Sequence, residues 1–327
     1  MTEHVDILLA TFDGEEFVEE QLESILEQTH QNFTIIIGDD ASRDTTPDII
    51  TQYLKKGYGK LFFHQYLDNV GTTLNFSRLS DLATSDYIML SDQDDIWLPS
   101  KIENTLKKMK ELESKYGKHT PLLVHTDLSV VDDNLKMIHP SFWKFCGYYP
   151  ENDSLSRVLT QNNVMGSTIM INRALLDIAF PIPKTALMHD HWLSLVATIF
   201  GKVGWVEQQT MCYRQHNANS IGAYQRCDIR QISSLFLDRR KVSNSEELLQ
   251  AKIRQAKTIF DQYQNQLSPK TKEIIEKFIN LTNTSLFEEI KTRFHYNFHR
   301  GGVYREAYDI IASFLRNATA DKHKTKF

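Results

Sequence analysis

The sequence predicts an α/β protein in which a mostly parallel, Rossmann-like sheet carries helices on both faces and a helical C-terminal extension follows. Strand and helix signals alternate over the first hundred residues, which is typical of a parallel sheet. Acidic residues directly follow two of the predicted strands, and apolar residues recur at helical spacing near the C-terminus. We therefore expect an α/β domain over residues 1–225 and a helical extension over residues 226–327.

Four compact apolar runs predict the first strands of the sheet: Val5–Ala10, Phe33–Gly38, Leu61–Tyr66 and Tyr87–Leu90. Between the first two runs, apolar residues recur at helical spacing from Phe17 to Leu26. Thr46-Pro47 opens a second helix, with proline at an early position that a helix tolerates. Because ligands of such sheets bind beyond the carboxyl ends of the strands, acidic residues at those ends are candidate site residues.

The second half of the chain continues with a strand-like run at Thr168–Ile171 and an apolar helix that reaches Phe200. Further helical stripes follow over residues 246–267, from Ile274, and from Val303 to Leu315. Nothing in these last stripes is typical of a catalytic site, and we expect them to pack on a core or on a second subunit.

Composition limits the class of protein. The chain has 327 residues, 41% of them hydrophobic and 24% charged, which is typical of an ordinary soluble protein. Three scattered cysteines fit neither a disulfide framework nor a zinc site. The first residues have neither the basic nor the apolar segment of a signal peptide, and no run is long enough to span a membrane. We expect a cytoplasmic protein.

Charge is unevenly distributed along the chain. The net charge of −5 is the sum of −12 over residues 1–225 and +7 over residues 226–327. The acidic first part argues against nucleic acid as the main partner. The basic C-terminal part is compatible with a solvated helical face, with homodimer packing, or with peripheral contact to an anionic membrane at its inner face. Apolar spacing there is clearer than any one-sided basic face, so we favour packing.

The first acidic cluster is Asp39-Asp40, where the second predicted strand ends. Adjacent carboxylates repel each other unless a ligand or cation offsets their charge. Capping of the following helix by Ser42 or Asp44 explains those two residues, but it does not explain Asp39. A carboxylate that accepts hydrogen bonds from a nucleoside base would explain it.

The second acidic cluster, Asp92, Asp94 and Asp95, follows the fourth predicted strand. Three carboxylates within four positions suit a hard divalent cation that holds phosphate oxygens and keeps few protein ligands. The alternative for an isolated acidic turn is a solvated loop. Together with Asp39 at a neighbouring strand end, the pattern favours the cation site.

These clusters belong to a set of motifs in register, namely Leu9–Gly14, Gln28-Thr29, Asp39–Thr46, Asn69-Val70-Gly71 and Leu90–Trp97. In this order they resemble the family 2 inverting glycosyltransferases of GT-A fold, the nucleotide-diphospho-sugar transferase fold. They are most similar to the rhamnosyltransferase-like branch that builds bacterial surface polysaccharides. The resemblance covers about residues 4–222.

The resemblance implies roles for individual positions. Thr11, Asp13, Asp39 and Asp40 would line the nucleoside pocket, with Asp39 reading the base, and Asn69 would join the donor-binding set. Asp92 and Asp94 would form the D-x-D metal signature, Asp94 as the direct ligand and Asp92 nearer the ribose.

One position departs from the family's pattern, because Ala41 stands where the family usually has glycine. A methyl group is tolerated there unless the turn requires a positive φ.

His189-Asp190-His191-Trp192 opens the apolar helix of the second half. On local evidence, an N-cap aspartate between two exposed histidines is as good an explanation as a site. The resembled family places its catalytic base at such a helix-opening acidic position, which makes Asp190 the candidate. A carboxylate beside the anomeric carbon can take the proton of the acceptor hydroxyl.

Arg214 and His216 lie near the end of the similar region, where a surface turn is the alternative explanation. The resemblance implies that they close over the donor diphosphate, with His216 as a further metal ligand. Carboxylate, imidazole and phosphate oxygens together suit Mn²⁺ or Mg²⁺.

The predicted reaction is an inverting single displacement on a nucleotide sugar. The resembled branch implies dTDP-L-rhamnose as donor and a lipid-linked or polymeric glycan as acceptor. A UDP-hexose donor (glucose, galactose, N-acetylglucosamine or galactofuranose) is the alternative within the family. A sugar nucleotidyltransferase would need a basic Gly-rich loop, but Thr11–Glu16 has no Lys or Arg. A non-catalytic glycan-binding module has no need of carboxylates at two strand ends.

Overall fold

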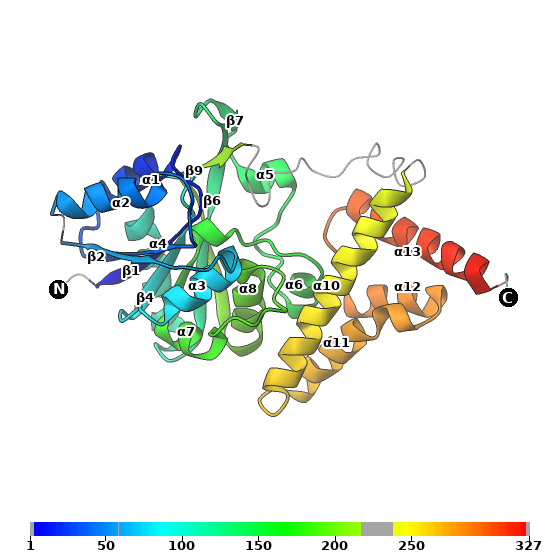
Figure 1. Ribbon diagram of the computed structural model, residues 1–327. Helices are drawn as coiled ribbons and strands as arrows, with labels where there is room; N and C mark the ends of the chain where they lie inside the picture. Colours follow the sequence, from blue (N-terminus) through cyan, green and yellow to red (C-terminus); the bar gives the residue numbers. More distant parts are fainter. Residues whose placement is uncertain (1–2, 58, 217–237, 325–327) are drawn as a thin grey trace. The chain divides into compact units, whose positions relative to one another are not determined.

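The computed structural model describes residues 3–57, 59–216 and 238–324, and the chain forms two compact units (Figure 1). The first unit comprises Met1–Phe145 and Val164–Tyr224, and the second comprises Cys146–Asn163 and Gln225–Phe327. The helical unit therefore includes a segment from the middle of the sequence. The boundary expected at residue 225 lies outside the described residues.

The first unit is built on one sheet, which has nine strands among the described residues. Its order is β3-β2-β1-β4-β8-β6-β9-β5, with β7 paired to β6. The strands are β1 Val5–Thr11, β2 Phe33–Asp39, β3 Leu61–Gln65, β4 Tyr87–Ser91, β5 Ile96–Trp97, β6 Leu122–Asp132, β7 Met137–His139, β8 Met170–Asn172 and β9 Lys202–Gln215. The α/β prediction is confirmed, and the first four predicted strands form β1 to β4.

The sheet is mixed. Strands β1 to β4 pair in parallel, as do β6 and β9, whereas β8 runs antiparallel to both β4 and β6. Along the parallel part, Thr11 pairs with Asp39 across β1 and β2, and Leu9 pairs with Ser91 across β1 and β4. The carboxyl ends of β1, β2 and β4 therefore meet at one edge of the sheet, as parallel pairing requires.

Helices cover both faces of this sheet (Figure 1). On one face lie α1 Val18–Leu26, α2 Thr46–Lys55 and α4 Lys101–Tyr116, and on the other lie α3 Thr72–Ser80, α7 Arg173–Ala179 and α8 His189–Phe200. The side chains of β1 are buried along its whole length, because a strand covered on both faces has no solvent side. The short helix α5, Phe142–Cys146, follows β7.

The second unit is helical. Its elements are α6 Leu155–Thr160, α10 Arg239–Tyr263, α11 Pro269–Ile279, α12 Leu286–Tyr296 and α13 Val303–Lys324. Ser268 and Ser285 cap α11 and α12 by accepting backbone N–H bonds, and Phe278 packs edge-on against Phe298 in the interior. Among the described residues, no helix is both long and apolar enough to cross a membrane.

Candidate active site

Asp39, the last residue of β2, accepts three hydrogen bonds from Thr11 and Ser42. Its Oδ1 accepts from Thr11 Oγ1 at 3.0 Å and from Ser42 Oγ at 2.5 Å, and its Oδ2 accepts from the backbone N of Ser42 at 3.0 Å. The side chain is fully buried. Asp39 therefore joins the ends of β1 and β2 and shapes the loop after β2. A nucleoside base that donates a hydrogen bond to Asp39 would share carboxylate oxygens that already accept three hydrogen bonds.

Asp40 is equally well provided with donors. Its carboxylate accepts from the backbone N atoms of Val70, at 3.0 Å, and Gly71, at 2.8 Å, and it forms an ion pair with Arg78. The guanidinium of Arg78 stacks 3.4 Å from the ring centroid of Tyr66. Asp40 thereby fixes the loop that presents Asn69, whose side chain is exposed.

Two residues of the neighbouring loops adopt left-handed backbone conformations. Asp13 has φ 44°, and its Oδ1 accepts from the backbone N of Arg43 at 2.7 Å. Ala41 has φ 66°, so the turn does require the positive φ that glycine favours. The alanine is accommodated with strain, since its Cβ disfavours this region by about 1–2 kcal/mol.

Gln93 connects the loops after β1 and β4, and the sequence analysis gave it no role although it lies within the motif Leu90–Trp97. Its Oε1 accepts from the backbone N of Phe12 at 2.8 Å, and its Nε2 donates to the Phe12 carbonyl at 2.9 Å. A Cβ at Gly14 would lie 2.2 Å from Gln93 Oε1, so glycine is needed for this approach. The side chain between Asp92 and Asp94 thus locks the acidic turn to the loop after β1.

The acidic turn after β4 concentrates negative charge. Burial, together with the charges of Asp94 and Asp190, raises the pKa of Asp92 to about 7. Burial and the charges of Asp94 and Asp92 also raise the pKa of Asp95 well above its usual range. Because the charge of Asp94 raises the pKa of both Asp92 and Asp95, the turn lacks sufficient countercharge.

Lys101, the first residue of α4, is a buried opposing charge that sequence reasoning missed. Its side chain is fully buried, with Nζ 4.7 Å from the ring centroid of Trp97 and 3.5 Å from Thr210 Oγ1. Burial lowers the pKa of Lys101 to about 7, although Asp95 and Asp92 oppose the shift. Lys101 therefore offsets the charge of the turn only in part.

Arg214, on β9, holds the acidic turn from the protein side. Its Nε donates to the Asp94 carbonyl at 3.0 Å and its Nη1 to the Asp133 carbonyl at 2.8 Å, and its guanidinium forms an ion pair with Glu20. Only 3% of the residue is exposed. Phosphate contact by Arg214 would therefore need its guanidinium to exchange these partners.

His216 is the last described residue before the gap, and it lies beside Asp94. Its Nε2 is 3.0 Å from Asp94 Oδ2, and its ring packs against Phe17 with the centroids 4.6 Å apart. The structure thus brings these two predicted metal ligands into contact. The residues that follow His216 in the similar region, 217–222, lie outside the described residues.

Asp190 lies in the first turn of α8, with 8% of its surface exposed. The N-cap residue of this helix is Met188, so Asp190 is not explained as an N-cap. Its charge contributes to the raised pKa of Asp92, which places the two carboxylates near each other. The helix N-terminus favours the ionised form of Asp190.

The histidines on either side of Asp190 are both buried, at 2% exposure, so they are not exposed flanks. Burial lowers the pKa of His189 to about 3, and its ring packs against Phe76 with the centroids 4.4 Å apart. A Cβ at Gly166 would lie 2.3 Å from His189 Nε2, so this glycine makes room for the ring. His189 is therefore a neutral core side chain whose packing holds the first turn of α8 in place.

The donor set fits a divalent cation. No group of three or more His, Cys, Asp or Glu side chains in the described ranges is arranged to hold a metal ion by itself. The contact between Asp94 and His216, with the raised pKa of Asp92, instead fits a cation that takes its remaining ligands from a diphosphate. Such a cation would supply the missing countercharge.

A scan against protein-family models matches residues 6–117 to "Glycosyl transferase family 2". This segment contains both acidic clusters but neither Asp190 nor Arg214.

Curated relatives extend the similarity to about two thirds of the chain. The dTDP-rhamnosyl transferase RfbG of Shigella flexneri is 29% identical over 231 residues, which cover 66% of this chain and 74% of the relative. The putative teichuronic acid biosynthesis glycosyltransferase TuaG of Bacillus subtilis is 28% identical over 206 residues, covering 62% of this chain and 76% of the relative.

Two solved structures share the fold. TarS of S. aureus, in complex with UDP-GlcNAc, aligns with a TM-score of 0.57 at 15% identity and covers 89% of this chain and 72% of its own. The mannosyltransferase PcManGT of Pyrobaculum calidifontis, in complex with GDP-Man and Mn²⁺, aligns with a TM-score of 0.55 at 13% identity, covering 99% and 83%.

Proposed function

The chain is a family 2 glycosyltransferase of the GT-A fold, and from this premise we propose that it catalyses an inverting transfer of one sugar from a nucleotide-diphosphate donor to a hydroxyl of a cell-surface polysaccharide precursor. One observation carries the proposal: Asp190 lies close enough to the acidic turn for its charge to raise the pKa of Asp92. This proximity supports a site in which Asp190 would act as the general base beside a turn that would bind the diphosphate.

Asp190 is the proposed base. Its carboxylate takes the proton of the acceptor hydroxyl as the oxygen bonds to the anomeric carbon and the bond to the diphosphate breaks. The near-complete burial of Asp190 excludes most of the water that would compete with the acceptor. Attack from the face opposite the leaving group inverts the anomeric configuration.

Asp94, Asp92 and His216 are the proposed residues that hold the cation, which we take to be Mn²⁺ or Mg²⁺. When bound, the cation neutralises the charge that develops on the leaving nucleoside diphosphate. Arg214 holds the backbone of the turn through the Asp94 carbonyl, and Gln93 ties the turn to Phe12. These contacts support a turn that is already in place before the donor binds.

Thr11, Asp13, Asp39 and Asn69 are the proposed nucleoside-binding residues. The exposed loops that carry Asp13 and Asn69 offer contacts to the base and ribose. Asp39 and Asp40 shape these loops through their hydrogen bonds, and either can also accept from the base where a lone pair remains.

We propose L-rhamnose, from dTDP-L-rhamnose, as the sugar transferred. The similarity to the dTDP-rhamnosyl transferase of Shigella flexneri supports this donor. A UDP-hexose is the alternative, and the UDP-GlcNAc complex of the fold neighbour TarS is the observation that favours it. A panel of both donors, assayed for acceptor-dependent release of dTDP or UDP, distinguishes them.

The helical unit is the proposed contact with other molecules. Phe287 of α12 is 75% exposed and Phe314 of α13 is 55% exposed, so apolar side chains remain available for a subunit interface. We favour a homodimer through these helices, with peripheral contact to the inner face of the membrane as the alternative. A dimeric mass in solution and no binding to anionic liposomes support the dimer, whereas salt-sensitive liposome binding by a monomer supports membrane contact.

Asp190→Asn tests the chemistry. The amide keeps the size and polarity of the side chain but cannot accept the proton, so we expect kcat to fall by roughly 10²–10⁴ while donor affinity is kept. Asp177→Asn, at an exposed position of α7, is the control and should keep full turnover. Near-normal turnover of Asp190→Asn would place the base elsewhere, and His191 would be examined next.

A further inference from the structure

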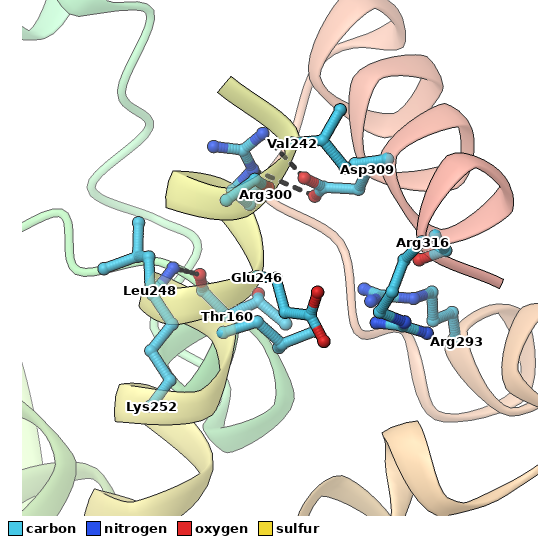
Figure 2. A pocket seen from close by; sticks show the side chains of 13 residues that line it. Thr160, Val242, Glu246, Leu248, Lys252, Arg293, Arg300, Asp309 and Arg316 are labelled. Atoms are coloured by element: carbon cyan, nitrogen blue, oxygen red, sulfur yellow. Dashed lines mark hydrogen bonds and ion pairs between the residues drawn. The ribbon is translucent and has the colours of Figure 1, made fainter. Parts of the chain in front are cut away.

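A solvent-open pocket in the helical unit has four basic and two acidic side chains in its lining (Figure 2). Its empty space, including the mouth, is about 540 Å³. The four cationic residues come from three helices and one connection: Lys252 of α10, Arg293 of α12, Arg300 between α12 and α13, and Arg316 of α13. None of these four residues belongs to the proposed active site.

Lys252 has no carboxylate partner among the residues that the structure describes. Its Nζ donates to the backbone carbonyl of Thr160 at 2.6 Å, which orients the ammonium without neutralising it. Burial and the nearby charges of Arg300 and Arg293 lower the pKa of Lys252 to about 7, although Asp309 opposes the shift. The ammonium group therefore lies in a positive potential that an anion would relieve.

Arg293 and Arg316 share a single carboxylate. Both guanidinium groups form ion pairs with Glu289, which is fully buried and also accepts from Ser313 Oγ at 2.7 Å. Among the described residues, two guanidinium groups thus meet one carboxylate at the pocket wall. Arg300, in contrast, is balanced by Asp309 at 2.7 Å.

The lining contains two acidic residues, Asp309 and Glu246. Figure 2 shows the Glu246 carboxylate directed towards the side of the pocket that holds Arg293 and Arg316. No ion pair within 4.0 Å joins Glu246 to either arginine in this described part of the chain. A carboxylate there disfavours a bare anion but can accept hydrogen bonds from hydroxyl groups.

We propose that this pocket binds a phosphate ester that carries hydroxyl groups. Arg293, Arg316 and Lys252 would hold the phosphate oxygens, because guanidinium and ammonium groups form strong charge-assisted hydrogen bonds to phosphate. Glu246 would accept from the hydroxyls of the esterified sugar or glycerol. The same chemistry is present in a soluble sugar phosphate and in the glycerophosphate head group of a lipid.

The test is calorimetric titration of the full chain at low salt with inorganic phosphate, glycerol phosphate and glucose 1-phosphate. We expect the two esters to bind more tightly than inorganic phosphate, and Lys252→Gln to weaken ester binding about tenfold, the loss of one charge-assisted contact. Glutamine can still donate to the Thr160 carbonyl, so the fold should be kept. Lys257→Gln, at an exposed position of the same helix, is the matched control and should change binding by less than about twofold.

Glu246→Gln separates the two halves of the proposal. Removing the opposing charge should tighten inorganic phosphate and reduce the preference for the hydroxylated esters. Vesicles of phosphatidylglycerol, compared with phosphatidylcholine, identify the source of the ligand: binding to the former that Lys252→Gln removes indicates a lipid head group, and binding of the soluble esters alone indicates a free sugar phosphate.

Absence of binding by every phosphate compound, or equal binding by Lys252→Gln and Lys257→Gln, would overturn the proposal. The readout is binding and needs no turnover, so it stands or falls separately from the glycosyl transfer. Lys252→Gln should also keep normal turnover with a soluble acceptor, because Lys252 is not part of the proposed catalytic machinery.

Discussion

The two acidic clusters of this protein follow β2 and β4, the parallel strands on either side of β1, yet their surroundings differ. Around Asp39 and Asp40, every carboxylate oxygen accepts hydrogen bonds from the protein, and Arg78 adds a counterion. In the turn of Asp92, Asp94 and Asp95, burial and the charge of Asp94 raise the pKa of both Asp92 and Asp95. Donors of the protein satisfy the first cluster, whereas the second is where we propose that a cation binds.

The two clusters differ in whether groups of the protein compensate their negative charge. Backbone N–H groups of the loops that carry Ser42, Val70 and Gly71 compensate the first pair, so its carboxylates build structure. For the second cluster, Arg214 donates mainly to carbonyls and Lys101 is itself buried and weakly basic. The proposed cation would supply positive charge at this turn.

The largest expected effect is on activity, at Asp94. Asp94→Ala removes the proposed direct cation ligand that contacts His216, so we expect turnover to fall by about 10³-fold or more, and Asp92→Ala to lose less. EDTA should abolish the activity of the wild-type chain, and Mn²⁺ or Mg²⁺ should restore it. Asp81→Ala, at an exposed position after α3, is the control. Full activity after metal stripping in chelator would remove the cation from the mechanism.

The next effect is on stability, at Asp40. Asp40→Ala leaves Arg78 without its counterion and the N–H groups of Val70 and Gly71 without an acceptor, so we expect a loss of about 3 kcal/mol in the free energy of unfolding. Urea denaturation measures it, with Asp68→Ala at an exposed loop position as the control. If both variants lose equally little, the first cluster does not hold the loop.

The raised pKa of Asp92 makes the free energy of unfolding depend on pH. Because its folded pKa of about 7 lies above the ordinary 3.8, Asp92 favours folding at acid pH, and this contribution is lost as pH rises towards 7. In EDTA, Asp92→Asn should therefore gain stability relative to wild type between pH 5 and pH 8, by about 1–2 kcal/mol after allowance for partial exposure. Urea titrations at both pH values measure this gain. A difference that does not change with pH would show that Asp92 is not electrostatically strained.

The smallest effect is expected at Ala41. Ala41→Gly removes the Cβ that disfavours φ 66°, so we expect the free energy of unfolding to rise by about 1 kcal/mol, partly offset by the greater freedom of glycine in the unfolded chain. Thermal and urea unfolding measure the change. A destabilised variant would mean that the methyl group packs favourably enough to outweigh the backbone strain.

Much of the fold could be predicted from the sequence because β1 to β4 are short apolar runs separated by helical stripes. β6 could not, because His125, Thr126 and Asp127 interrupt its apolar pattern although all three are buried. Their environment comes from β9, which pairs with β6 from a distant part of the chain. Local periodicity does not record such pairing.

The sequence predicts candidate site residues, but it does not predict the partners that surround them. The sequence places Asp39 after a strand but does not reveal that Ser42 and Thr11 saturate it. Gln93 is a single polar residue between two acids, with no spacing that marks it as a link to Phe12. Lys101 starts a helix whose pattern gives it no reason to be buried.

Calorimetric titration of Mn²⁺ into the chain, with saturating dTDP or UDP, tests the central claim most directly. We expect Mn²⁺ to bind the wild-type chain and the Asp81→Ala control alike, and Asp94→Ala to bind it at least tenfold more weakly. Unchanged Mn²⁺ affinity in both Asp94→Ala and Asp92→Ala would contradict the assignment of the second acidic cluster as the cation site.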